Sequence, residues 1–162
     1  MYSIQKHLAY NAWANRRIAN MLKNIPEKDL FMEYPSSFKN IYRTVLHIWD
    51  AEVIWFTRIQ GGQITNWPSE HFTGSPAEAL DKYPLASEEL LSFIKDKDSS
   101  FLESIVRYKN LKGMEYAQPV EDILFHVVNH GSYHRGQIIT LLRLAGHSSI
   151  ENTDLIAFLR QQ

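Results

Sequence analysis

Apolar residues recur at intervals of three and four along much of this chain, which is the spacing of helices that bury one face. The first such stretch runs from about Tyr2 to Asn24, and Pro26 follows it. The second runs from about Asn40 to Gln60 and stops at Gly61-Gly62. The first part of the chain therefore predicts two long helices joined by an irregular crossing over residues 27–39.

Two further long helices are predicted in the second part. The motif Ser75-Pro76-Ala77-Glu78 is typical of a helix start, with serine as N-cap, proline at the first helical position and glutamate at the third. This helix should reach about Lys97 and bend near Pro84. Another is predicted over Pro119–Ala145, followed by Gly146. A short final helix is expected over Thr153–Arg160.

The remaining segments are connections. Gln63–Gly74 has no regular pattern, and a structureless connection of this length is often functional, for example as a lid. Between Ile105 and Ala117, two short apolar runs flank Lys109–Gly113, which predicts either a hairpin or an extended excursion. The 162 residues, of which 44% are hydrophobic, are expected to form a single domain over 1–162. The fold class is all-α: a four-helix bundle with long crossings and a short C-terminal helix.

Composition excludes several classes of function. Lys and Arg total 17 and Asp and Glu total 18, so no basic excess favours nucleic acid. There is no cysteine, so metal ligands must come from His, Asp or Glu, and any thiol chemistry must use a small soluble thiol. No run of about 18 apolar residues predicts a membrane span, and Met1–Leu30 lacks the pattern of a signal peptide. We therefore expect a soluble, cytoplasmic protein.

Three of the seven histidines, His126, His130 and His134, lie four residues apart on one predicted helix. On a helical projection that places His130 at 0° and adds about 100° around the axis for each residue, His134 falls at ~40° and His126 at ~−40°. The apolar arc, at roughly 20–80°, contains Ile123, Val127, Ile138, Leu141 and Ala145. His134 lies inside this arc and His130 at its edge, so these two imidazoles are predicted to face the core and His126 the periphery.

The best third ligand is His47, which lies in the middle of the second helix and shares a face with Ala51 and Ile54. Three histidines with an open coordination position are typical of catalytic metal sites. Glycine at position 131 destabilises the helix by about 1 kcal/mol relative to alanine. Its presence there suggests that a neighbouring element or a ligand approaches the helix closely. Because position 131 is glycine, the His-x-x-x-His spacing lacks the glutamate of zinc proteases. The competing interpretation is that the histidines are ordinary core residues.

Several nearby residues have open roles. Asp50 would either orient an imidazole or be a solvated charge, and His126 would be a surface residue or a second-shell partner. Gln137 projects close to His130 and is expected to form a hydrogen bond within the site, whereas Arg135 is expected to be structural or a dimer contact. Outside the site, the expected roles are core for His7, solvent exposure for His71 and His147, and packing within the bundle for Trp13, Trp49, Trp55 and Tyr133.

The sequence resembles the DinB (damage-inducible) family of bacterial four-helix-bundle proteins. The resemblance lies in Leu46-His47-Ile48 with Ala51-Glu52 and Trp55, and most specifically in the stretch Asn129–Gln137. Tyr10–Asn15 and Thr153-Asp154-Leu155 are also typical, so the likeness covers nearly the whole chain.

The resemblance implies an up-down-down-up bundle, often a homodimer, with one divalent metal held by His47, His130 and His134. Nickel or zinc is expected, with manganese or iron as further candidates. Some relatives look like transferases of a low-molecular-weight thiol, others resemble thiol-dependent isomerases, and many have no assigned activity.

The leading hypothesis is therefore a metal-dependent transferase that couples a small-molecule thiol to an electrophile. The metal would lower the pKa of the thiol, and the thiolate would attack the electrophile. One alternative is a metal-dependent hydrolase, which would turn over without added thiol. Another is a non-enzymatic metal-binding protein of the stress response, which would show neither activity.

Overall fold

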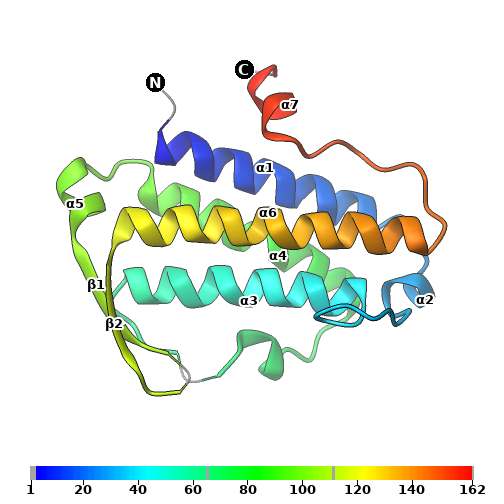
Figure 1. The fold of residues 1–162 in the computed structure, drawn as a ribbon, viewed down its shortest axis with the longest axis horizontal. Coiled ribbons are helices and arrows are strands. Elements are labelled where there is room, and N and C mark those ends of the chain that lie inside the picture. Colours follow the sequence, from blue (N-terminus) through cyan, green and yellow to red (C-terminus); the bar gives the residue numbers. More distant parts are fainter. Residues whose placement is uncertain (1–2, 65, 111, 162) are drawn as a thin grey trace.

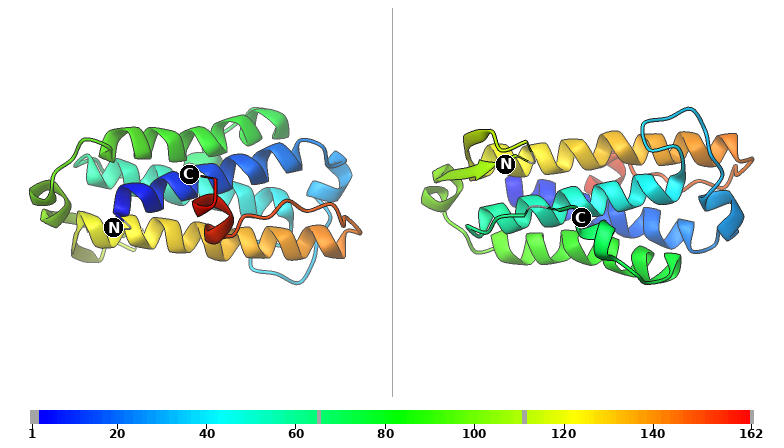
Figure 2. Two further views of the ribbon diagram at one scale, coloured as in Figure 1. Left: turned by 90° about the horizontal axis from the view of Figure 1, so that it is seen from above. Right: turned by 90° about the horizontal axis from the view of Figure 1, so that it is seen from below.

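Long helices pack side by side in the computed structural model, which describes residues 3–64, 66–110 and 112–161 (Figure 1). They are α1 (Ile4–Leu22), α3 (Ile41–Ile59), α4 (Pro76–Ile94) and α6 (Val120–Leu144). α1 and α6 run in one direction and α3 and α4 in the other, and each helix packs against two of the others (Figure 2). The predicted all-α, up-down-down-up bundle is confirmed.

Polar side chains begin three of these helices. Ser3 accepts a hydrogen bond from the backbone N–H of Lys6, and Asn40 accepts one from that of Arg43. The predicted capping box of α4 is confirmed, because Ser75 and Glu78 bond reciprocally. Tyr2, where the sequence places the start of the first helix, lies outside the described residues.

Three short helices were missed by the pattern analysis: α2 (Glu27–Leu30), the 3-10 helix η1 (Pro68–His71) and α5 (Ser99–Glu103). Each has four or five residues, too few to show a helical repeat. The C-terminal helix α7 (Leu155–Leu159) is shorter than predicted. Within the described residues, no helix combines the length and the apolar character of a membrane span.

The parallel arrangement of α3 and α4 requires a connection that runs the length of the bundle. The described residues 60–64 and 66–75 belong to this crossing, in which η1 packs on α3 (Figure 1). At one end of the bundle, β1 (Ile105–Lys109) and β2 (Glu115–Pro119) form an antiparallel hairpin that leads into α6. Of the two predicted alternatives for this segment, the hairpin is confirmed.

The apolar core is divided into two clusters along the bundle. The first cluster contains residues of the first half of α1, the second half of α4 and the first half of α6. The second cluster contains residues of the second half of α1, the first half of α4, the second half of α6 and the first part of α3. By helical spacing, Val128 and Ile139 project away from the histidine face of α6. Val128 is fully buried within this chain, and Ile139 packs against the second cluster.

A buried polar layer separates the two clusters, and every long helix contributes to it. Arg135 donates from Nη1 to the side-chain oxygens of Asn11 (2.7 Å) and Asn15 (2.6 Å). The amide nitrogens of both asparagines donate to Oε1 of Glu52, at 2.7 and 2.8 Å. Ser87 donates to the other carboxylate oxygen. Burial raises the pKa of Glu52, and these hydrogen bonds oppose that shift.

Gly131 allows this layer to form. A Cβ atom at this position would lie 2.9 Å from Nη1 of Arg135 and 2.9 Å from Oδ1 of Asn11. The predicted close approach at Gly131 is therefore to a buried guanidinium and an amide. Gly136, on the same helix, faces open space.

The two glycines provide a matched test of this close packing. Gly131→Ala should lower the free energy of unfolding by about 1–3 kcal/mol, because the buried guanidinium has to shift. Gly136→Ala should raise it by about 0.5–1 kcal/mol through helix propensity alone. Urea denaturation of both variants measures the difference. Stabilisation by both substitutions would show that the layer tolerates a methyl group at 131.

Candidate metal site

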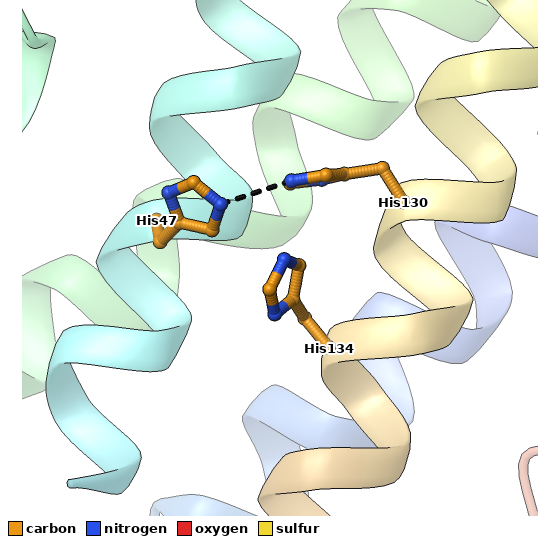
Figure 3. Close-up of side chains that lie close together, drawn as sticks. All are labelled: His47, His130 and His134. Carbon is orange, nitrogen blue, oxygen red and sulfur yellow. Dashed lines mark hydrogen bonds between the residues drawn. The ribbon is translucent and has the colours of Figure 1, made fainter. Parts of the chain in front are cut away.

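His47, His130 and His134 converge at the seam between α3 and α6 (Figure 3). Their nearest ring nitrogens all lie within 4.8 Å of one another. Nε2 of His47 lies 2.9 Å from Nε2 of His130, as one imidazole donates to the other. The ring of His134 is centred 4.4 Å from that of His130 and 4.6 Å from that of His47. The trio selected from the sequence is therefore brought together by the fold.

This arrangement fits the dimensions of a divalent transition metal. Metal–nitrogen distances of ~2.0–2.1 Å in a tetrahedral site place two imidazole nitrogens about 3.3 Å apart. The His47–His130 pair, at 2.9 Å, is a few tenths of an ångström closer than this, and the full spread of the three nitrogens is within 4.8 Å. Binding a metal therefore requires the three side chains to adjust by rotation. Three nitrogen donors leave one tetrahedral position for water or substrate.

Neighbouring side chains fix the orientation of the rings. Phe38 stacks on His47 with ring centres 4.0 Å apart and meets His134 edge-on at 5.4 Å. Oε1 of Gln137 lies 2.7 Å from Nδ1 of His134, so that Nδ1–H donates and Nε2 is left as the ligand atom. The prediction that Gln137 forms a hydrogen bond within the site is confirmed. Phe38 was missed, because it lies in the irregular crossing where no periodicity marks an inward-facing residue.

The site keeps its histidines neutral. Burial, together with neighbouring histidines, lowers the pKa of His47 to about 4 and that of His130 to about 3. Burial also lowers the pKa of His134, and the hydrogen bond to Gln137 opposes that shift. Neutral imidazole is the form that binds metal, so these side chains need not lose a proton at neutral pH.

Asp50 has neither of its two predicted roles. It is buried and accepts hydrogen bonds from Ser69, at 2.7 Å from the backbone N–H and 2.6 Å from the hydroxyl. Burial raises its pKa, and the bonds from Ser69 oppose the rise. Asp50 thus attaches η1 to α3, and this attachment places Trp67, whose ring centre lies 6.0 Å from that of His47.

His126 lies outside the trio, as predicted. It is exposed, its ring is centred 5.7 Å from that of His130, and it meets Trp55 edge-on at 5.4 Å. Arg135 is structural, as part of the buried polar layer.

Two predictions about other residues were wrong. Tyr133 is 63% exposed instead of packed within the bundle, although its edge contacts His134. His147 is only partly exposed, because it forms a 3.0 Å hydrogen bond with Asp29. His71, by contrast, is exposed, as expected.

A pocket of about 390 Å³ opens beside the histidines. Its walls come from α3, the 60–75 crossing, the turn of the hairpin and α6. They consist of His47, Ala51, Ile54, Trp55, Arg58, Trp67, Asn110, Lys112, Met114, His126 and His130. None of these described lining residues is Asp or Glu. A larger cavity of about 870 Å³ lies against the hairpin, away from the trio.

Comparison with known proteins places this fold and site in context. Protein DinB of Bacillus subtilis (strain 168) is 30% identical over 147 residues, 86% of this chain and 84% of that protein. A DinB-like protein from Bacillus cereus ATCC 10987 covers 94% of this chain and 99% of its own, at 19% identity and a TM-score of 0.70.

A third similar protein is YfiT from Bacillus subtilis, described as a probable metal-dependent hydrolase with an unusual four-helix bundle topology. The match covers 91% of this chain and 90% of YfiT, at 13% identity and a TM-score of 0.73. This likeness concerns the fold. The sequence model of the DinB family matches residues 1–162. This chain belongs to the DinB family.

Proposed function

We propose that His47, His130 and His134 bind one divalent transition metal, and that the chain is a metal-dependent enzyme that transfers a small thiol to an electrophile. The observation that carries the proposal is the convergence of three neutral imidazoles, two of which, His47 and His130, line an open pocket. Nickel and zinc suit a donor set of imidazoles without thiolate, with manganese or iron as weaker candidates. Such a metal would act as a Lewis acid that lowers the pKa of a bound nucleophile.

The lining of the pocket favours a thiol over water as nucleophile. A thiol ionises near pH 8.5, so it needs far less acidification than water, whose pKa is about 15.7. Water attack commonly uses a carboxylate as general base, and no described residue of the pocket lining is Asp or Glu. Two carboxylates of α3 are engaged, Asp50 with Ser69 and Glu52 in the polar layer. Asp122 lines a separate, smaller pocket with His126 and is not part of this lining.

His126 is suited to accept the thiol proton. It lines the pocket beside His130, and burial lowers its pKa, so the imidazole is neutral at physiological pH. It lies outside the trio and is free to exchange protons with solvent because it is exposed. We assign it the role of general base in the transfer.

The second candidate is a metal-dependent hydrolase. The description of YfiT, which shares the bundle topology, favours it. The same three histidines and the same pocket would serve both reactions, so the requirement for thiol separates them. A protein that binds metal and has neither activity would be the non-enzymatic alternative.

Metal content tests the site itself. The untagged protein should contain about one metal ion per chain by mass spectrometry. His47→Ala and His134→Ala should lose it while retaining helical circular dichroism, and His126→Ala should keep it. A wild-type protein that stays metal-free after incubation with nickel, zinc and manganese would leave the trio as core residues.

Acidification should destabilise the metal-free protein. The two depressed pKa values, about 4 and about 3, lie below the ordinary value of 6.5 that the unfolded chain has. Below pH 6.5 the unfolded chain therefore takes up protons that the folded chain does not, and stability falls until the folded-state pKa values are reached.

Urea midpoints across this pH range measure the effect. The double variant His47→Gln/His130→Gln should lose stability less steeply than wild type. The exposed control His71→Gln should follow wild type, and equal slopes in all three proteins would contradict the assignment.

Thiol dependence decides between the two reactions. Turnover of an electrophile such as a haloalkane should require an added thiol, and His126→Gln should lower kcat by about 10²–10⁴-fold while metal content is unchanged. Ester or amide hydrolysis by the loaded protein without thiol would instead establish the hydrolase.

A further inference from the structure

Arg58 lies on the same face of α3 as His47, at the far end of the pocket. His47, Ala51, Ile54, Trp55 and Arg58 follow one another at helical spacing, and all five line the pocket. Eleven residues at 1.5 Å per residue separate the ends of this row by about 16 Å along the helix axis. The guanidinium is at the tip of a long side chain that leans towards the N-terminus of α3, so it lies nearer to the histidines than the Cα atom of Arg58 does.

The guanidinium is buried without a counter-charge. Arg58 is only 7% exposed, and no carboxylate in the described part of the chain pairs with it. Its charge lies over the rings of Trp55 and Tyr108, 4.7 and 4.5 Å from the ring centres. Its Nη2 donates to the carbonyl of Lys109 at 3.1 Å, and its buried Nε has no hydrogen-bond partner.

Such a group is unusual in a folded protein, because buried charges are normally paired. Desolvation lowers the pKa of Arg58, and Tyr108 opposes the shift. An anion bound in the pocket would supply the counter-charge that the Arg58 guanidinium lacks. Lys112 adds a second positive charge to the lining, and Trp55 and Trp67 provide apolar walls between the two ends.

We propose that this pocket binds an elongated small organic acid whose carboxylate or phosphate group is held by Arg58, with Lys112 adding charge. The planar guanidinium fork matches either anion. The rest of the molecule lies along α3, and its reacting atom is presented to the histidines. This substrate class rests on the proposed function, which makes the histidine end the reacting end.

The anion site is tested first without metal. Calorimetric titration of the metal-free protein with hexanoate and with hexanamide compares ligands that differ in charge and hardly in shape. Wild type should bind hexanoate about tenfold more tightly than hexanamide. Arg58→Gln should reduce this ratio of affinities to about one. Arg58→Lys should keep part of the preference, and Lys112→Gln should lower the ratio by a smaller factor. Arg107→Gln, an exposed arginine on the hairpin, removes the same charge outside this pocket and should leave the ratio unchanged.

A second arm measures the length of the site. The cobalt-substituted protein is titrated with ω-mercapto acids of increasing length, from mercaptopropionate to mercaptooctanoate, and with the amide of each. Visible absorption reports thiol binding. The preference for acid over amide should be largest for the longer chains and should disappear in Arg58→Gln.

The outcomes separate this inference from the proposed function. Thiol binding with no preference for the acid in either arm would overturn the anion site and leave the metal site standing. A carboxylate preference in the metal-free protein, without thiol binding after loading, would support the anion site and overturn the thiol transferase. If Arg58→Gln lowers only the urea midpoint and leaves the ratio unchanged, Arg58 merely clamps the hairpin and the inference is wrong.

Discussion

The buried polar layer is the constraint on which the rest of the structure depends. An arginine and a glutamate lie in the middle of the bundle, and burying either charge without partners would cost several kcal/mol. Only one register of the helices allows Asn11 and Asn15 to bridge Arg135 and Glu52. Because the layer is satisfied as a whole or not at all, it selects against a bundle in which one helix has slipped by a turn.

The three histidines of the proposed metal site take their geometry from this register. Glu52 lies on the same helix as His47, and Arg135 directly follows His134, so the layer that aligns α3 with α6 also places the imidazoles opposite each other. Phe38 stacks on His47, and the edge of Tyr133 contacts His134. Partial burial lowers the pKa of His47 and His130 and keeps both rings uncharged at neutral pH, which suits the proposed metal binding but makes the metal-free protein sensitive to acid.

The sequence predicted the long helices and the inward-facing histidines, because these depend on patterns within single helices. The direction of the helices was implied by the resemblance to the DinB family. His130 and His134 could be assigned from their position relative to the apolar arc, and His47 from its inward-facing neighbours. The polar layer was missed, since pairing Glu52 with Arg135 requires knowledge of the register between helices. Asn11 and Asn15, four residues apart on the buried face of α1, were the available signal. Asp50 was misassigned because its partner, Ser69, lies in a crossing without periodicity.

The two kinds of segment around the pocket have different freedom to change. The imidazoles are carried by helices that the core and the polar layer hold in place, whereas Trp67 and Lys112 are carried by connections at the surface. The crossing is joined to α3 through Ser69 and has to span the bundle, but a longer connection would span it as well. Substitutions and insertions in these connections can therefore reshape what the pocket admits while the three histidines keep their arrangement. In such a scaffold, sequence changes that alter ligand choice should occur first in the connecting segments, whereas the helices should keep the shared features.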